Sequence, residues 1–126
     1  MPSRRGALAA PLVVLLACGG GGGTTAPPAA PHRGDAGGGR VVYETRCAPC
    51  HGLDGAGDGP AAAAISPKPR NFRDPAFWNG RTPGQLRLVI EQGKPGTLMA
   101  PFAGALSPAE IDDVVAYLQS FRPAGS

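Results

Sequence analysis

The sequence contains few of the residues that build metal centres and redox-active thiol sites. Its 126 residues include three cysteines and two histidines, of which Cys18 and His32 lie outside residues 47–51. A structural zinc site needs about four ligands, most often as two well-separated pairs. A thioredoxin-like dithiol requires a surrounding βαβ pattern, which this sequence does not show. The small number of ligands therefore argues against a zinc site, and the missing βαβ pattern argues against a thioredoxin-like dithiol.

Clustered positive charge and long apolar runs are also missing. The net charge is +3, and no basic run is interleaved with aromatic residues, which account for 6% of the chain. Nucleic acid is therefore not an expected partner. The apolar stretch at residues 7–17 is interrupted by Pro11 and is too short to span a bilayer comfortably. The length of 126 residues leaves room for one domain.

The N-terminus has the pattern of an export signal. The pair Arg4-Arg5 precedes the apolar stretch, so residues 1–17 are interpreted as a signal peptide. The segment Leu15-Leu16-Ala17-Cys18 resembles a bacterial lipobox, in which the cysteine becomes the first mature residue and carries lipid. We therefore expect Cys18 to anchor the protein to a membrane without spanning it. The alternative is ordinary cleavage, which leaves an exported free thiol.

A flexible tether is predicted over residues 18–39, which are rich in glycine, proline, alanine and threonine and show no periodicity. His32 lies in this segment and is interpreted as a solvated linker side chain. Folding is expected to begin near Arg40. The domain then occupies residues 40–122, and residues 123–126 form a short tail.

Residues 47–51 read Cys-Ala-Pro-Cys-His, and the pattern Cys-x-x-Cys-His is the attachment site of a c-type haem. Each thiol forms a thioether with one vinyl group, and the two intervening residues let one backbone turn present both sulfurs to one porphyrin edge. His51 then lies under the macrocycle, where its imidazole can bind the iron as proximal ligand. A disulfide between Cys47 and Cys50 would close a short, strained loop and leave His51 without a role.

The stretch after this motif is predicted to wrap closely around the haem. Residues 52–60 are too rich in glycine for a regular element, and residues 66–72 are extended because their prolines disfavour helix. A proximal histidine commonly donates its second ring N–H to a carbonyl. The carbonyl of Pro67 or of Pro69 is the expected acceptor.

Polar side chains near the middle of the chain are candidate partners of the haem propionates. Arg70 either pairs with a propionate or is simply solvated. Trp78 could place its indole N–H on a propionate. Together with Phe72 and Phe77, Trp78 is expected to pack on the haem faces or their flanks.

Two capping boxes predict the starts of two amphipathic helices. Thr82-Pro83-Gly84-Gln85 has proline at the first helical position, and its helix is expected to end at Gly93. Ser107-Pro108-Ala109-Glu110 opens the last helix. The apolar stripe of this helix is formed by Ile111, Val114, Val115, Leu118 and Phe121.

Met99 is the one methionine besides Met1, and it lies on the Pro- and Gly-bounded loop between these two helices. A core methionine normally lies within a helical stripe, so this position favours a sixth ligand to the iron. A thioether is a soft, neutral ligand, and Met/His ligation raises the reduction potential. The alternatives are a packing methionine or an open iron, and His32 and Lys94 are weaker ligand candidates.

With these motifs in place, residues 40–122 resemble a class I monohaem cytochrome c domain, as found in bacterial respiratory complexes. The resemblance implies an all-α fold of three to four short helices and long loops around one covalent haem. It also implies that the first and last helices cross near Tyr43 and Tyr117. The segments that carry the resemblance are residues 47–52, 55–60, 67–72, 98–102 and 111–118.

The same resemblance implies the cofactor and its attachment. Cys47 and Cys50 would hold one haem c, with His51 as proximal and Met99 as distal ligand of the iron. The proline-rich central segment is similar to cytochrome subunits of quinol- or oxidase-linked complexes. That similarity does not select one of these complexes.

The expected function is one-electron transfer without catalysis of a substrate reaction. The main hypothesis is a lipid-anchored carrier on the periplasmic side of a bacterial cell envelope, moving electrons between redox protein partners of an electron-transport chain. A second hypothesis is a fixed cytochrome subunit of a quinol-, oxidase- or dehydrogenase-linked complex. A haem sensor or peroxidase is a third, and it would require an open iron. The protein is accordingly expected to be a monomer or a complex subunit.

Overall fold

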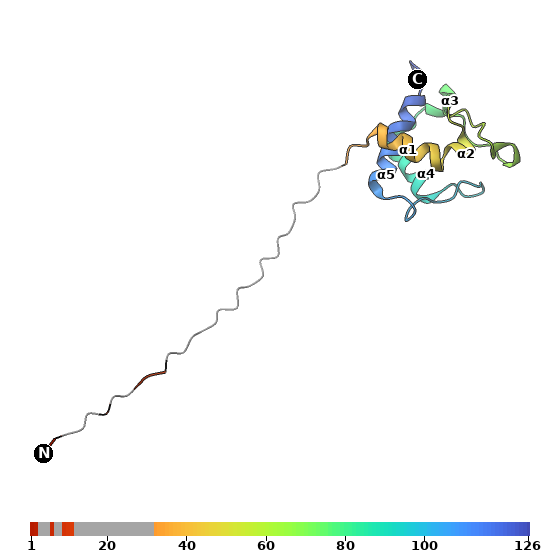
Figure 1. Cartoon of the computed structure of the whole chain (residues 1–126). Coiled ribbons are helices and arrows are strands. Elements are labelled where there is room, and N and C mark those ends of the chain that lie inside the picture. Colours follow the sequence, from red (N-terminus) through yellow and green to blue (C-terminus); the bar gives the residue numbers. More distant parts are fainter. Residues whose placement is uncertain (3–5, 7–8, 12–31) are drawn as a thin grey trace.

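The computed structural model describes residues 1–2, 6, 9–11 and 32–126 (Figure 1). Within these residues there is no β-strand, and an isolated bridge joins Ala103 to Leu106. None of the described helices is long and apolar enough to cross a membrane. The predicted all-α class with short helices and long loops is confirmed. The helices are α1 (Ala36–Arg46), α2 (Ala48–His51), α3 (Pro75–Trp78), α4 (Pro83–Gln92) and α5 (Pro108–Leu118), with 3-10 turns at Ala62–Ala64 and Gln119–Phe121.

The first and last helices, α1 and α5, pack against each other, and α4 also contacts α5 (Figure 1). Tyr43 of α1 is 0% exposed, and its ring centroid lies 5.2 Å from those of Tyr117 and Phe121. The Tyr43 hydroxyl donates a 2.8 Å hydrogen bond to the carbonyl of Gly52. This aromatic cluster therefore joins the pair of helices to the chain that directly follows His51, and the implied meeting of Tyr43 with Tyr117 is confirmed.

Helix α1 begins earlier than the sequence analysis proposed, so the tether boundary at residue 39 is wrong. Asp35 is the N-cap residue, and its carboxylate accepts hydrogen bonds from the backbone N–H groups of Gly37 and Gly38. Gly39 is buried where α1 meets α5, and a Cβ added there would overlap the carbonyl of Asp113. Glycine was interpreted as a source of flexibility. Here it is required because two helix backbones approach closely.

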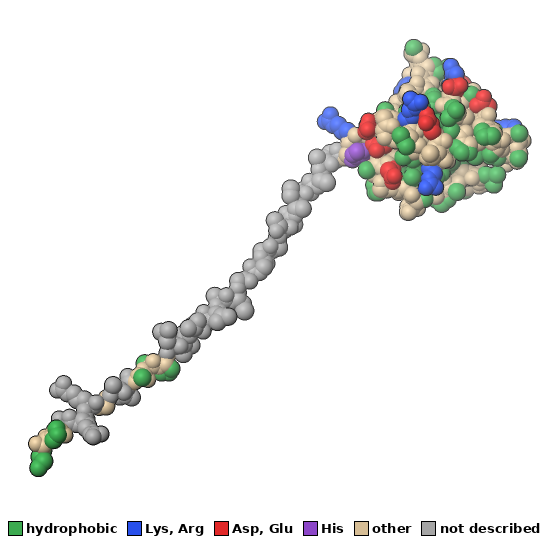
Figure 2. Space-filling model, viewed as in Figure 1, with side chains coloured by type: hydrophobic (Ala, Val, Ile, Leu, Met, Phe, Trp, Pro, Cys, Tyr) green, Lys and Arg blue, Asp and Glu red, His purple; other side chains and the backbone are tan. Residues whose placement is uncertain are grey.

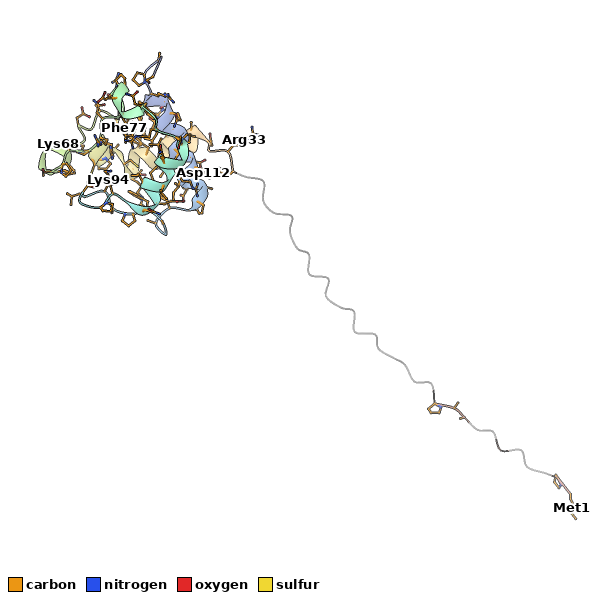
Figure 3. The ribbon with its side chains drawn as sticks, turned by 180° about the vertical axis from the view of Figure 1, so that it is seen from behind. Met1, Arg33, Lys68, Phe77, Lys94 and Asp112 are labelled. Atoms are coloured by element: carbon orange, nitrogen blue, oxygen red, sulfur yellow. The ribbon has the colours of Figure 1, made fainter. Side chains whose placement is uncertain are left out.

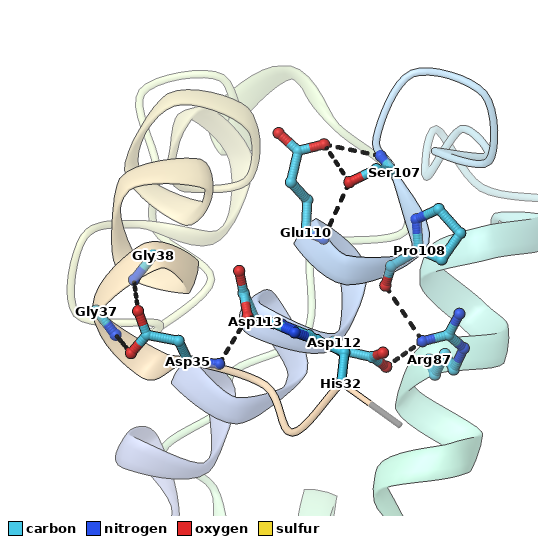
Figure 4. A network of polar contacts seen from close by, with 10 residues as sticks. All are labelled: His32, Asp35, Gly37, Gly38, Arg87, Ser107, Pro108, Glu110, Asp112 and Asp113. Atoms are coloured by element: carbon cyan, nitrogen blue, oxygen red, sulfur yellow. Dashed lines mark hydrogen bonds and ion pairs between the residues drawn. The ribbon is translucent and has the colours of Figure 1, made fainter. Parts of the chain in front are cut away.

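The interpretation of His32 as a solvated linker side chain also needs correction. His32 is exposed, but its Nε2 lies 2.6 Å from Oδ1 of Asp113 in α5 (Figure 4). The Asp35 N–H donates to the same oxygen at 2.6 Å. Burial acts to raise the pKa of Asp113, but these two hydrogen bonds and the nearby imidazole hold it below its usual value. Residues 32–35 thus pack on α5 instead of extending into solvent, and Figure 2 shows a histidine side chain where the N-terminal segment meets the domain.

The two predicted capping boxes are confirmed, and they define the loop that carries Met99. Thr82 and Gln85 cap α4 reciprocally, and Gly93 follows its last residue. Ser107 and Glu110 do the same for α5, as Figure 4 shows. Each helix turns its apolar side inward. The buried residues of the two helices are Leu86, Ile90, Ile111, Val114, Val115 and Leu118.

The close approach at Gly39 leads to a stability prediction. In Gly39→Ala, α1 and α5 must separate to fit the new methyl group, so we expect a loss of about 1–3 kcal/mol in the free energy of unfolding. Gly84→Ala is a matched control, because Gly84 also lies within a helix and an added Cβ there meets only Thr82 Oγ1 at 3.9 Å. That variant should be neutral or roughly 0.5–1 kcal/mol more stable. Thermal unfolding of the two purified variants, followed by circular dichroism, compares them, and equal stability would refute the packing argument.

Candidate functional site

One apolar cavity of about 420 Å³ brings together the four residues that the sequence analysis assigned to cofactor attachment and ligation. Cys47, Cys50 and His51 line this cavity, and so does Met99, which lies on the loop that follows α4. Buried or half-buried side chains of α1, α4 and α5, such as Tyr43, complete the lining. Pockets of this size and character are typical of cofactor sites. Cys18 lies outside the described residues.

The two cysteines of the motif lie on a single turn at the junction of α1 and α2. The N–H groups of Cys50 and His51 both donate to the Cys47 carbonyl, at 3.1 and 2.9 Å. Both thiols are unbridged and half-buried, so the disulfide alternative is not realised here. Burial, with a smaller contribution from Cys50, raises the pKa of the Cys47 thiol to about 11. The turn thus presents two unbridged thiols to one cavity, as attachment of a porphyrin edge requires.

His51 is held in a defined orientation, although by a different carbonyl from the two that were predicted. Its Nδ1 lies 3.1 Å from the carbonyl oxygen of Arg70, so the acceptor is neither Pro67 nor Pro69. The register follows from the glycine loop: the Phe72 N–H donates to Gly55, and a Cβ added at Gly57 would lie only 2.6 Å from the Pro69 oxygen. Both the Pro69 and the Arg70 carbonyls lie close to Gly57, and the Arg70 oxygen is the one within hydrogen-bond distance of the imidazole. Pro67 and Pro69 both line the cavity wall instead.

The electrostatics of His51 suit a metal ligand. Burial lowers its pKa, and the hydrogen bond to the Arg70 carbonyl opposes this effect in part. The imidazole is therefore neutral at pH 7, and because Nδ1 donates to a carbonyl, the lone pair is on Nε2. The ring also stacks on Phe72, with centroids 4.5 Å apart and planes 16° apart. A neutral, oriented imidazole in an apolar cavity can coordinate iron through Nε2.

Met99 is half-buried, and local hydrogen bonds hold its backbone. The Lys94 N–H donates to the Met99 carbonyl at 2.9 Å, and the Met99 N–H donates to Thr97 Oγ1 at 3.1 Å. Its neighbour Leu98 is 70% exposed and also lines the cavity. The loop thus carries a thioether to the cavity and an apolar side chain to its outer edge.

Trp78 does not take part in the site, so its predicted contact with a propionate is wrong. The side chain is 2% exposed, and its Nε1–H donates to the carbonyl of Phe72 at 2.7 Å. It is not among the residues that line the cavity, whereas Phe72 and Phe77 are. The short helix α3 turns the indole into the core, where it packs edge-on against Phe77. Arg70, by contrast, is exposed and lies on the cavity wall, where both of its predicted environments are compatible with the structure.

The cavity wall also has a charge pattern that the sequence analysis missed. Five cationic residues line it, and no aspartate or glutamate does. They form no basic run in the sequence. Arg70 and Lys94 were named singly in the sequence analysis, but the sequence contains no signal that all five lie around one cavity. In Figure 3, Arg33 marks the junction of the N-terminal segment with the domain, and Lys68 and Lys94 lie away from that junction. The five are Arg46, Lys68, Arg70, Arg81 and Lys94.

The residues around the cavity fit a covalently bound haem. Two thiols on one turn, one oriented imidazole nitrogen and one thioether sulfur share an apolar lining. Within the described part of the chain there is no cluster of three or more His, Cys, Asp or Glu side chains that could hold a metal ion instead. The donor set therefore suits haem iron and does not suit a metal bound by protein ligands alone.

Comparisons with known proteins agree with this geometry. The cytochrome c family model matches residues 36–122. The chain is 32% identical over 91 residues to cytochrome c-554(547) of Halothiobacillus neapolitanus, covering 71% of this chain and 99% of that protein. It is 36% identical over 86 residues to dihydro-heme d1 dehydrogenase of Pseudomonas aeruginosa, covering 68% of this chain and 15% of that enzyme.

A solved structure supports the same assignment. A chain of the reducing HAO-like protein complex of Kuenenia stuttgartiensis superposes with a TM-score of 0.59 at 33% identity, covering 68% of this chain and 41% of the other. The family model begins at α1 and extends over the helices and the residues that line the cavity. The chain therefore belongs to the cytochrome c family, with haem c covalently bound and electron transfer as its chemistry.

Proposed function

We propose that this chain is a one-electron carrier in which His51 and Met99 are the two axial ligands of the haem iron. The observation that carries the proposal is the shared cavity, which both side chains line together with the two motif cysteines. When bound, haem c supplies one iron that gains or loses a single electron. Cys47 and Cys50 hold the group in place, so it stays attached in both redox states.

The roles of the two axial residues differ. The hydrogen bond between His51 and the Arg70 carbonyl fixes the imidazole plane and increases its basicity. Met99 supplies a neutral sulfur, which favours Fe(II) relative to a second imidazole and so raises the reduction potential. With both residues as ligands, the iron would have no position for a substrate, as expected of a carrier and not of a sensor or a peroxidase.

We propose that redox protein partners dock at the outer edge of the cavity. The exposed Leu98 offers an apolar contact there, and the exposed cations Arg46, Lys68, Arg70 and Lys94 line the same cavity. Small, transient contacts are typical of electron-transfer complexes. A partner with acidic residues around its own redox centre would be attracted to this face.

The proposed location is the periplasmic side of a bacterial cell envelope. Residues 1–17 would be removed as a signal peptide, and lipid on Cys18 would anchor the mature protein. Residues 32–35 join the domain at Asp113, and neither they nor Asp113 line the cavity. A tether attached there leaves the cavity edge accessible while keeping the domain at a raised effective concentration near its partners.

A fixed subunit of a larger oxidoreductase is the second candidate function. Two of the similar proteins favour it, since one is a chain of a protein complex and the other is an enzyme of which this chain matches 15%. The two candidates differ in their behaviour after membrane extraction. A carrier elutes alone in size-exclusion chromatography, whereas a fixed subunit co-elutes with the other subunits of its complex.

The axial ligation is tested with Met99→Ala in the full chain, produced in a host that attaches c-type haem. The wild type should be low-spin, with the weak far-red band of a Met–Fe(III) bond, and its reduced form should bind carbon monoxide poorly. The variant should lose the band and bind carbon monoxide readily, because its iron is open. Leu98→Ala is the neighbouring control and should keep both properties. A high-spin wild type that binds carbon monoxide would instead support a sensor or peroxidase.

The charge at the cavity edge is tested by the oxidation rate of the reduced protein with ferricyanide, an anionic one-electron acceptor. We expect the rate constant to fall roughly tenfold from low to near-physiological ionic strength, because salt screens the attraction. A cationic cobalt complex should show the opposite trend. Lys94→Glu should weaken the ferricyanide dependence, whereas Arg73→Glu, which lies outside the cavity lining, should not. Rates independent of salt would contradict electron exit at this edge.

The anchor is tested by cell fractionation and mass spectrometry of the mature protein. The wild type should be found in the membrane fraction with a diacylglyceryl group on Cys18, because acyl chains partition into the bilayer. Cys18→Ser should be exported in soluble form, with an unchanged haem spectrum. A soluble wild type whose mature N-terminus carries no lipid would contradict the lipoprotein proposal.

A further inference from the structure

One of the five cationic side chains on the cavity wall differs from the others in its burial. Arg81 is half-buried, whereas Arg46, Lys68, Arg70 and Lys94 are all exposed. A charged group that is removed from water needs a compensating partner. The surroundings of Arg81 therefore indicate which of the five is suited to bind an anion inside the cavity.

The guanidinium of Arg81 is held by two contacts from Phe77. Its Nε–H donates to the Phe77 carbonyl at 2.8 Å, and its central carbon lies 4.3 Å from the centroid of the Phe77 ring. Both Phe77 and Arg81 line the cavity. These contacts use one N–H and one face of the group, and they leave the terminal N–H pairs without an acceptor among the described residues.

The other candidates are less well prepared. The Lys68 ammonium already donates a hydrogen bond to the Ala62 carbonyl at 2.8 Å. Arg46, Arg70 and Lys94 make no side-chain hydrogen bond within the described part of the chain, so each would lose more rotamer freedom on fixing an anion. Arg81 has already lost that freedom in the folded protein.

We propose that Arg81 is a positioning residue that holds a propionate of the haem through its two terminal nitrogens. A carboxylate is the anion that haem c brings to an apolar cavity, and a planar guanidinium matches it with two parallel N–H···O bonds. The pair would neutralise the propionate charge where water is partly excluded. Of the two roles left open for Arg70 in the sequence analysis, this assignment favours the solvated one and gives the propionate to Arg81.

Loss of the Arg81 charge should lower the reduction potential of the haem. Removing the positive charge of Arg81 leaves a propionate anion uncompensated, and this stabilises Fe(III) relative to Fe(II). At a fixed applied potential, the ratio of oxidised to reduced protein should rise roughly threefold to tenfold in Arg81→Gln. A propionate without its guanidinium also titrates closer to neutral pH, so the midpoint potential should become pH-dependent between about pH 5 and pH 8.

The experiment is spectroelectrochemical titration of the haem-loaded full chain across this pH range. Arg81→Gln should show the lower potential and the new pH dependence. Arg81→Lys should be closer to the wild type in both properties, because it keeps the charge and loses only the planar fork. Arg70→Gln tests the competing residue on the same wall. Arg73→Gln is the control for charge alone, because Arg73 lies outside the cavity lining.

Each outcome decides the proposal. A curve for Arg81→Gln that coincides with that of Arg73→Gln overturns it, and so does a larger effect in Arg70→Gln. If Arg81→Gln does not retain haem, the Lys variant and the propionate bending modes in the resonance Raman spectrum of the wild type carry the test, and modes typical of a solvated propionate overturn it. The inference depends on haem attachment and not on Met99, so the far-red band in the same samples reports separately on the axial ligand.

Discussion

The buried contact of Tyr43 between α1 and α5 is the interaction on which the site depends. The two helices position the aromatic cluster, and the Tyr43 hydroxyl ties that cluster to the Gly52 carbonyl, one residue beyond His51. The motif lies between these two fixed points, with α1 before it and Gly52 after it. The direction of both thiols and of the imidazole thus follows from a packing contact that contains none of them.

The glycine loop that follows adds the second constraint. Its backbone bonds to Phe72 and to His51 place the extended segment beside the imidazole, and this selects the Arg70 carbonyl as acceptor. The loop has almost no side chains of its own, so backbone can approach backbone. A domain of this size buries only a thin core from its own residues. The apolar surface of haem c completes that core, so attachment of the cofactor and stability of the fold are physically connected.

The charges of the domain serve two different parts of it. The carboxylates of Asp112 and Asp113 on α5 are engaged by Arg87 and His32, which connects α4 and the N-terminal segment to the last helix (Figure 4). The cavity wall carries cations and no carboxylates. Anions associated with the haem or with a partner therefore meet a positive surface, whereas Asp112 and Asp113 of α5 are already paired with Arg87 and His32.

The sequence by itself determined the features that depend on neighbours in the chain. The spacing of two cysteines and a histidine, the two capping boxes and the position of Met99 on a loop are all local patterns, because one helical turn or one cap involves only a few consecutive residues. Tertiary structure decided the rest. Whether Gly39 is a linker or a helix contact depends on α5, the acceptor of His51 depends on the register of a distant segment, and the directions of Trp78 and Arg81 depend on how α3 meets the core. Each of these involves groups brought together by packing, and a pattern of residue types along the chain contains no information about which of several similar groups will be nearest.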